Sequence, residues 1–544
     1  MSRKKKAPAP RPAHLGRPGG ESDAPREGRR DLLWAAALTL LAWVHRLAFL
    51  RSNRDWDWPF TIFYEGDSET FFRAARALLA GKLYDNGIPF HPPGFPFFLA
   101  AVHGLLGAGA PEATVGHAAV KAVLALVGSL AVGLLYLLVR PYLGRTAALL
   151  AALLSLYHFG LYVLAVAPVS EGLYLDLLLL ALLVWSRRLE HPLTAPGGRA
   201  GGSGAALLLG LLFGALSLTR AEAVLPAALL VAVGVGGVLA GRRGMAGLKP
   251  WALVLAGWVL VVAPWTARNA VRLAAADERL HLPEPLPRFV PITLYGPLNL
   301  ALANWDGADG TFSRRLLASR STSPVLDLAD PEHLHLLLHG DAVAWSWVRG
   351  HPAAFSRLVL RKWGLVLRSL ELGWTQWDWP GGLFGERLPI DVFVPESRPA
   401  RFLPRVTIPL ALLGLLACAL APGGPRRWAL LVLLLTAAGF FTTALFFGYV
   451  RQGLLLLPFW FTLVAAGLLW PVDLLLKRTP WRTGLAPADP PRRLLAVLGG
   501  AALALLVVEG WGARADRNYH ATGSTVAGER YLNRDERVFL EVAP

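Results

Sequence analysis

The chain contains almost no cysteine, since Cys418 is the single one among 544 residues. No disulfide can form within the chain, and thiols give no indication of its compartment. Charged residues are also scarce, at 17%, whereas 54% of the residues are hydrophobic and the mean hydropathy is +0.44. Repeated apolar runs of about 20 residues match the thickness of a bilayer core, and they lack the period-two alternation of a membrane β-barrel. The composition therefore predicts an all-α polytopic membrane protein.

Several common catalytic motifs are also missing. The sequence has no P-loop, nucleophile elbow, CxxC or HExxH pattern, so ATP-driven transport and serine-hydrolase chemistry lack their usual markers. Gly234-Val235-Gly236-Gly237 lies inside an apolar run and is interpreted as a helix-packing or bending element. His335 and His339 share one face of a predicted helix. They suit a metal site or, more simply, a surface amphipathic helix.

About eleven apolar runs are long enough to be membrane spans. Their approximate ranges are 32–50, 115–139, 146–165, 170–186, 205–219, 222–240, 250–266, 403–421, 428–447, 453–471 and 494–509. Two further runs are predicted to be interfacial or re-entrant helices, because 95–109 is short and 353–371 is interrupted by basic residues.

The N-terminal segment 1–31 is rich in Arg, Lys, Pro and Gly and includes Arg3-Lys4-Lys5-Lys6. It is too long and too proline-rich for a signal peptide, and no small-residue cleavage site follows the run at 32–50. We expect a disordered basic tail in the cytoplasm, followed by an uncleaved helix. Its charge fits the positive-inside rule better than nucleic-acid binding, so no nucleic acid partner is expected.

Alternating the spans from a cytoplasmic N-terminus gathers nearly the whole net charge of +17 on the inner side, as the positive-inside rule expects. The inner segments are 1–30, 140–145, 187–204, 241–249, 422–427 and 473–493. The long segments 51–114, 267–402 and 510–544 then lie outside the cytoplasm. The predicted domains are the basic tail 1–31, an N-terminal membrane module 32–266, an outer loop domain 267–402, C-terminal membrane helices 403–509 and an outer tail 510–544.

The first outer loop carries Glu65, Asp67 and Glu69 just before the stretch 71–79, which has the pattern of an amphipathic interfacial helix. A helix cap would explain one carboxylate at this position. Three carboxylates so close together beside a membrane are costly, and this favours a catalytic site centred on Asp67.

Glu171 is the second candidate catalytic residue. It lies in the predicted hairpin Ala165-Val166-Ala167-Pro168-Val169-Ser170-Glu171, on the same outer side as Asp67. Two carboxylates there could share a divalent metal ion, or divide the roles of base and orienting group. The alternative is that Ser170 and Glu171 form a capping box for the next helix.

Three arginines stand at outer ends of apolar runs. Arg220 follows Leu218-Thr219, Arg268 follows Trp265-Thr266-Ala267, and Arg451 follows Tyr449-Val450. Guanidinium groups bind phosphate in a bidentate manner and keep their charge when desolvated, so this arrangement suits a phosphate ligand. Taken singly, each arginine could equally extend its head group to the interface.

The motifs follow one another in a recognisable order. They are Gly66-Asp67-Ser68-Glu69, His91-Pro92-Pro93-Gly94-Phe95-Pro96, Pro168-Val169-Ser170-Glu171, Leu218-Thr219-Arg220, Ala263-Pro264-Trp265-Thr266-Ala267-Arg268-Asn269 and Tyr449-Val450-Arg451-Gln452. In this order and predicted sidedness, residues 30–470 resemble the bacterial GT-C glycosyltransferases of the protein-mannosyltransferase and aminoarabinose-transferase type, which are like glycosyltransferase family 39. Asp67-Ser68-Glu69 stands where those relatives often have adjacent Asp and Glu.

The resemblance implies a GT-C-like fold in the bacterial inner membrane, with the active site on extracytoplasmic loops. It implies transfer of a sugar from a polyprenyl-phosphate donor to an extracytoplasmic lipid, glycan or protein. Asp67 matches the family's first-loop catalytic aspartate, and Glu171 matches its second acidic position. The residues expected to bind substrate are Glu69, His91, Arg220, Arg268, Tyr449 and Arg451.

We expect an inverting displacement at the anomeric carbon, in which Asp67 orients or deprotonates the acceptor hydroxyl. The arginines, or a divalent cation, would stabilise the departing lipid phosphate. Two other classes compete with this prediction. A transporter or lipid flippase should place ionisable residues within spans and contain broken helices. A non-catalytic assembly subunit would use the outer segments to bind partners.

Overall fold

The computed structural model describes residues 24–51, 65–107, 117–187, 202–240, 245–321, 326–370 and 398–475. Within these ranges the regular elements are all helices, and no strand occurs, so the predicted all-α class is confirmed. Most of the predicted basic tail, the predicted span at 494–509 and the predicted outer tail lie outside the described residues.

Six of the described helices are long and apolar enough to cross a membrane. They are α1 (Ala24–Arg51), α4 (His117–Tyr157), α9 (Val224–Ala240), α10 (Lys249–Leu280), α17 (Gly424–Leu445) and α18 (Val450–Leu475). The bent pair α5 (Phe159–Val166) and α6 (Ser170–Trp185) makes a seventh span if the two count together. The helices confirm a polytopic membrane protein, whereas the number of about eleven spans stays a prediction.

Two further predicted spans are shorter helices. α8 (Ser203–Thr219) corresponds to the predicted span 205–219, and the apolar part of α16 (Arg398–Leu420) to 403–421. α1 begins earlier than predicted, at Ala24 rather than 32. Its first turns are held in place by buried Asp31, which pairs with Arg140 at 2.7 Å and accepts a hydrogen bond from Tyr136. An ion pair to α4 thus orders the end of the predicted tail.

Gly144 divides α4 into two arms. It has φ 82° and ψ 173°, a conformation that glycine adopts without steric cost. The chain reverses there, so that Gly128 on the first arm faces Ala165 in α5, where an added Cβ would lie only 2.6 Å from the alanine Cβ. The arms correspond to the predicted spans 115–139 and 146–165. The predicted inner loop 140–145 is thus part of a helix broken at one residue.

Small residues allow the helices to pack closely, as in other membrane bundles. Gly210 in α8 and Gly257 in α10 stand so close that a Cβ at Gly210 would lie 2.1 Å from the Val254 carbonyl. The predicted packing role of Gly234 is confirmed, because a Cβ there would lie 1.8 Å from the Trp251 ring. These contacts fix the helices whose outer ends carry the charged residues.

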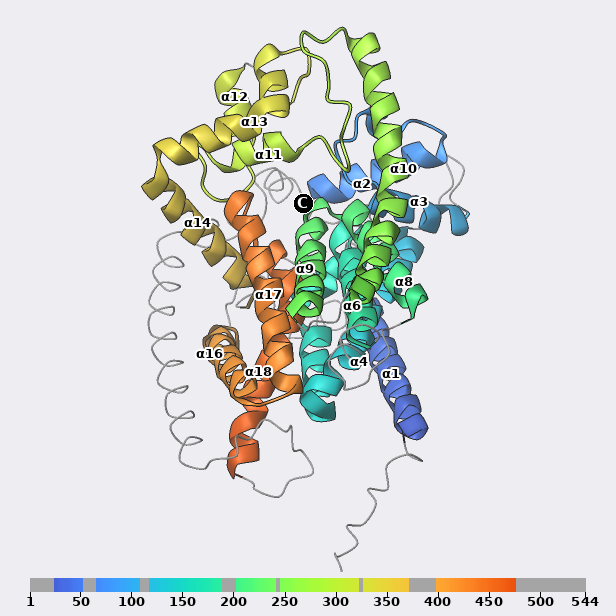
Figure 1. The fold of residues 1–544 in the computed structure, drawn as a ribbon, viewed down its shortest axis with the longest axis vertical. Coiled ribbons are helices and arrows are strands. Elements are labelled where there is room, and N and C mark those ends of the chain that lie inside the picture. Colours follow the sequence, from blue (N-terminus) through green and yellow to red (C-terminus); the bar gives the residue numbers. More distant parts are fainter. Residues whose placement is uncertain are drawn as a thin grey trace, which may run out of the picture.

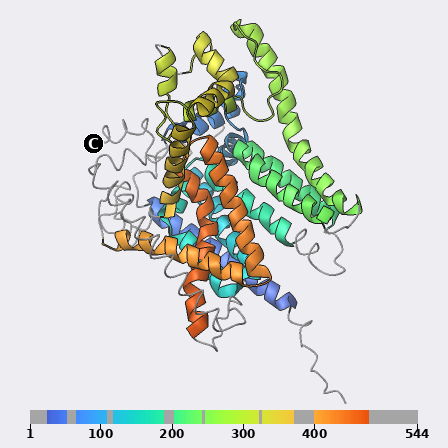
Figure 2. The ribbon, with the colours of Figure 1, turned by 60° about the vertical axis from the view of Figure 1, so that its left-hand side comes forward.

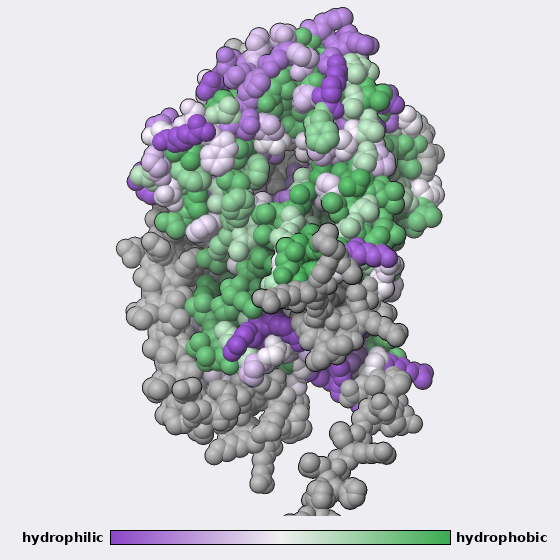
Figure 3. Space-filling model, in the orientation of Figure 1, coloured by the Kyte–Doolittle hydropathy of each residue, from purple (hydrophilic) through white to green (hydrophobic). Residues whose placement is uncertain are grey.

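Short helices lie next to the end of the bundle that the sequence predicts to face outward, and this end is called the outer end (Figure 1). They are α11 (Gly296–Ala303), α12 (Arg315–Arg320), α13 (Pro331–Gly350) and α14 (Pro352–Leu367). α11, α12 and α13 share a hydrophobic core with Leu273 and Ala276 of α10, and α10 extends beyond the bundle beside them in both ribbon views (Figures 1 and 2). Polar surface covers this part, whereas the bundle is largely apolar (Figure 3).

Three helices match the interfacial elements expected from the sequence. α2 (Glu65–Leu79) includes the predicted amphipathic stretch, and α3 (Gly94–Leu105) and α14 match the two runs predicted not to span. Between α2 and α3 lies the short helix η2 (Tyr84–Gly87), and η4 (Ala221–Ala223) links α8 to α9. These outer connections surround the ends of α6 and α18, where the predicted site residues lie.

Candidate functional site

Glu171 lies at the centre of a charged cluster at the outer ends of the spans. It stands in the first turn of α6, just after the break that follows α5, and its side chain is fully buried. Arg220 and Arg451 both donate to its Oε1. A helix N-terminus and two guanidinium groups together compensate a carboxylate that would otherwise be very costly to bury.

The alternative capping role of this pair is not supported. The N-cap residue of α6 is Val169, and no side chain caps the helix. Ser170 Oγ instead accepts a hydrogen bond from Arg220 at 3.1 Å. Both members of the predicted capping box therefore face the arginines.

Arg451 joins the two predicted catalytic carboxylates. From the first turn of α18, its Nη2 lies 2.5 Å from Asp67 Oδ2, while its Nε donates to Glu171. Asp67 comes from the first turn of α2 and Glu171 from α6, so three segments far apart in sequence meet at one guanidinium. The Arg451 side chain is 20% exposed and that of Asp67 is 51% exposed, which leaves the carboxylate within reach of a ligand.

Arg220 holds the other side of Glu171. It ends α8 in an extended conformation and begins η4. Its Nε donates to Glu222 Oε1 at 2.8 Å, and its side chain is 12% exposed. Among the described residues, the cluster thus contains three carboxylates and two guanidinium groups, which are joined by ion pairs.

The protonation of Asp67 follows from these neighbours. Burial acts to raise the pKa of Asp67, but attraction by Arg451, with smaller effects of His91 and Arg220, outweighs it and lowers the pKa below its usual value. Asp67 is therefore ionised at neutral pH and is a weak base while Arg451 holds it.

A second polar group lies on the loop between α2 and α3. Asp85 Oδ2 accepts a hydrogen bond from the His91 backbone at 2.9 Å and lies 3.1 Å from His91 Nδ1. Tyr84 donates through its hydroxyl to the carbonyls of His91 and Pro92. The His91 ring packs edge-on against Phe71, one helical turn beyond Asp67 on α2, with ring centroids 6.2 Å apart. This second group therefore adjoins the charged cluster.

The remaining predicted substrate-binding residues lie around these two groups. Glu69 pairs with Arg73 on its own helix. Arg268 donates to the Tyr84 carbonyl at 3.1 Å and stacks over Trp265, so it supports η2. Tyr449 packs beside Phe447 in the outer hydrophobic core. The substrate roles of these three residues stay predictions.

A metal ion does not fit the described residues. No group of three His, Cys, Asp or Glu side chains lies close enough together to hold one in this part of the chain. Glu171 directs Oε1 at two arginines rather than outward. His335 and His339 stack with ring centroids 5.1 Å apart, and His339 Nε2 lies 2.6 Å from Glu284. Positive charge at this site is supplied by arginine.

An apolar cavity lies close to the charged cluster. It is lined mainly by α6, α17 and α18, through residues such as Leu178, Leu435 and Leu455. Glu222, the partner of Arg220, is also in its wall. An amphiphilic ligand could therefore place an apolar chain among the helices and a polar head near the arginines.

Sequence reasoning missed two members of the site. Asp85 lies in Tyr84-Asp85-Asn86-Gly87, a run of ordinary turn residues, although it has a positive φ of 47° that is uncommon outside glycine. Glu222 lies two residues after Arg220, and no motif around it marks it as part of a site. Each of the two lies within six residues of a predicted site residue, His91 or Arg220, and this closeness was the available signal in the sequence.

The chain is similar to an archaeal oligosaccharyltransferase. The solved apo structure of the Archaeoglobus fulgidus enzyme aligns with 88% of this chain at 15% identity and a TM-score of 0.41. A structure of the same enzyme, AglB, with an inhibitory peptide and a dolichol-phosphate aligns with 88% of the chain at 14% identity and a TM-score of 0.39. The chain spans 56% of the length of either. No protein-family profile and no curated protein matches the sequence. A likeness of this degree assigns no family.

Proposed function

We propose that the chain is an integral membrane glycosyltransferase that moves a sugar from a polyprenyl-phosphate donor to an acceptor outside the cytoplasm. The observation that carries this proposal is the bridge formed by Arg451 between Asp67 and Glu171, with Arg220 on the opposite side of Glu171. An ionised, half-exposed carboxylate thus lies next to two shielded guanidinium groups, which supports a role in binding and transferring a phosphate-linked group. The order of the sequence motifs supports the same chemistry.

Each part of the site has a role in this reaction. Arg451 and Arg220 would stabilise the charge that grows on the departing lipid phosphate, and Glu171 holds both of them in place. Asp67 would orient the acceptor hydroxyl for attack on the anomeric carbon from the face opposite the phosphate. The nearby apolar cavity suits the first part of the lipid chain. The sugar, the acceptor and the location in a bacterial inner membrane are part of the same proposal.

Mass spectrometry of the cell envelope tests the proposal. A strain that lacks the chain should lose one sugar-bearing lipid, glycan or protein. Wild-type protein should restore it, and Arg451→Met protein, present in the membrane at the same level, should not. Purified wild-type protein in nanodiscs, supplied with an envelope extract of the deletion strain as the source of acceptor, should release undecaprenyl phosphate from undecaprenyl-phosphate monosaccharides. If the envelope is unchanged by deletion and no lipid phosphate is released, the proposal is wrong.

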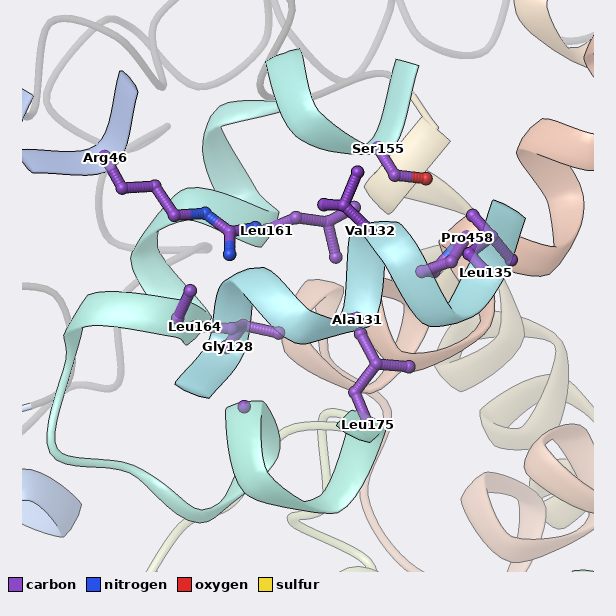
Figure 4. A pocket seen from close by; sticks show the side chains of 12 residues that line it. Arg46, Gly128, Ala131, Val132, Leu135, Ser155, Leu161, Leu164, Leu175 and Pro458 are labelled. Atoms are coloured by element: carbon purple, nitrogen blue, oxygen red, sulfur yellow. The ribbon is translucent and has the colours of Figure 1, made fainter. Parts of the chain in front are cut away.

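A transporter remains the second candidate because two ionisable side chains are buried within the spans. Arg46 of α1 and Asp176 of α6 are 2% and 6% exposed, and Arg46 donates to Ser129 at 2.9 Å. Arg46 also extends into a cavity between α1, α4 and α5 (Figure 4). Together with the 100° bend between α5 and α6, these features are those expected of a transporter.

A lipid translocation assay separates the two functions. In proteoliposomes, a flippase would expose a fluorescent polyprenyl phosphate to a quencher without breaking any bond. The glycosyltransferase would leave the lipid on its original side and release lipid phosphate only from sugar-bearing donors. Arg46→Met should abolish translocation in the first case. In the second case, Arg451→Met should abolish transfer.

A further inference from the structure

We propose that His91, held by Asp85, is the base that accepts the proton of the acceptor hydroxyl. This assignment rests on the proposed glycosyl transfer and adds a catalytic group to it. The reaction needs a proton acceptor, and Asp67 is poorly suited because Arg451 holds its carboxylate in an ion pair at 2.5 Å. A carboxylate that is paired in this way is a weak base.

Asp85 fixes the orientation of the His91 ring. One oxygen, Oδ2, accepts from the His91 backbone N–H and lies at hydrogen-bond distance, 3.1 Å, from Nδ1. A carboxylate at Nδ1 favours the tautomer that carries its proton there, which leaves Nε2 as the basic atom. This is the arrangement by which a carboxylate orients a histidine base in hydrolases. Among the described residues, no hydrogen bond to His91 Nε2 occurs, and the side chain is 33% exposed.

The backbone around Asp85 is built to hold this pair. Asp85 adopts a φ of 47°, a conformation that costs energy for a residue with a Cβ and tends to persist at functional sites. Tyr84 fixes the other end by donating to the carbonyls of His91 and Pro92. Arg268 donates to the Tyr84 carbonyl at 3.1 Å. The Asp85–His91 pair is thus held from both sides.

His91 also lies next to the carboxylate that would orient the acceptor. Its ring contacts Phe71 on α2, and Phe71 and Asp67 are four residues apart and share one helical face. The ring of Tyr295 also packs edge-on with the His91 ring, with ring centroids 5.6 Å apart. The charged and titratable groups around His91 are Asp85 of η2, Asp67 of α2, Tyr84 and Tyr295, with Arg268 beyond Asp85.

The proton and the bonds balance in a single displacement. The acceptor oxygen bonds to the anomeric carbon as the bond from that carbon to the phosphate oxygen breaks. The electron pair of the broken bond leaves with the lipid phosphate, next to Arg451 and Arg220. The hydroxyl proton passes to His91 Nε2 and from there to water. Asp67 orients the hydroxyl and stays ionised throughout.

Asp85→Asn is the sharpest test because it keeps the shape of the site and the conformation that asparagine tolerates. The amide N–H₂ would donate to Nδ1 and move the ring proton to Nε2, so the base would be lost although the ring stays in place. We expect a fall in kcat of about a hundredfold, the scale of a general base. The KM for an undecaprenyl-phosphate monosaccharide should change less than about twofold, and His91→Gln should act in the same way.

The pH profile separates catalysis from a structural role. Release of undecaprenyl phosphate by the full chain in nanodiscs should fall on the acid side in wild-type protein, as a histidine base becomes protonated. Both variants should lose that dependence, whereas His335→Gln, on the exposed face of α13, should keep it. Carbethoxylation of His91 by diethyl pyrocarbonate, followed by mass spectrometry, should be slower in Asp85→Asn protein, because the reagent attacks the unprotonated nitrogen.

Two outcomes count against the assignment in different ways. If wild-type protein is active and both variants keep its rate and pH profile, His91 is not the base, although the proposed function stands. If wild-type protein releases no lipid phosphate from any donor, the proposed function is wrong, and this assignment fails with it.

Discussion

Replacing Glu171 by Gln should be the most destabilising conservative change at the outer ends of the spans. The side chain is fully buried and accepts from Arg220 and Arg451, so an amide would leave both guanidinium groups without their shared counter-ion. Removing one partner of a buried ion pair costs about 3–5 kcal/mol. Because Arg220 keeps Glu222 and Arg451 keeps Asp67, the lower end, about 3 kcal/mol, is expected.

Glu222→Gln is the matched control for this prediction. Glu222 also pairs with Arg220, but its side chain is 24% exposed. Loss of this ion pair should therefore cost about 1 kcal/mol or less. Equilibrium unfolding by SDS in mixed micelles measures both variants. A double-mutant cycle of Glu171→Gln with Arg451→Met should show a coupling above about 1 kcal/mol. If Glu171→Gln is no more destabilising than Glu222→Gln, or the cycle shows no coupling, Glu171 does not hold the arginines.

Three further predictions concern the residues around this cluster. Arg451→Lys should lower lipid-phosphate release about a hundredfold, because one ammonium group cannot reproduce a guanidinium that reaches both Asp67 and Glu171; activity near the wild-type rate contradicts this. Gly448 lies just before Arg451, and a Cβ there would lie 2.4 Å from the Lys362 carbonyl, so Gly448→Ala should lower both lipid-phosphate release and stability. A Cβ at Gly364 meets nothing within 4 Å, so Gly364→Ala should change neither. Burial lowers the pKa of Lys362 to about 7 from 10.5, so the unfolded chain binds the extra proton between these values and stability should rise with pH across that window. Lys362→Met should remove this rise in thermal unfolding measured between pH 7 and 10, and a wild-type curve that is flat or falls there contradicts the assignment.

The sequence was sufficient to predict four of the five residues of the charged cluster, all but Glu222, but not their partners. Charges at the ends of apolar runs are rare, and their common sidedness singled out Asp67, Glu171, Arg220 and Arg451. That Arg451 reaches Glu171 across 280 positions depends on how the spans pack, which no local pattern reveals. The importance of Asp85 was hidden because its role depends on a backbone angle.

The fold was predictable to a similar degree. Apolar runs identified the helical class and most of the helices, because bilayer thickness sets their length. The reversal at Gly144 was predicted as a loop of six residues, yet a single glycine with positive φ makes it. Arg46 and Asp176 did not stand out in the sequence, since each is one charge within a long apolar run and only packing brings them together.

The length of α10 sets the distance between the membrane and the outer helices. Its 32 residues make a helix of about 48 Å, well beyond the roughly 30 Å of a bilayer core. Asn269, beyond the middle of α10, donates to the Val290 carbonyl at 2.9 Å, so the projecting part of the helix holds the non-helical segment 281–295 that leads to α11. The number of residues in α10 therefore sets both the distance and the direction at which the outer contacts lie. One residue inserted before Asn269 would raise the outer contacts by about 1.5 Å and rotate them by about 100°, which turns a change far from the arginines into a misaligned acceptor side of the site.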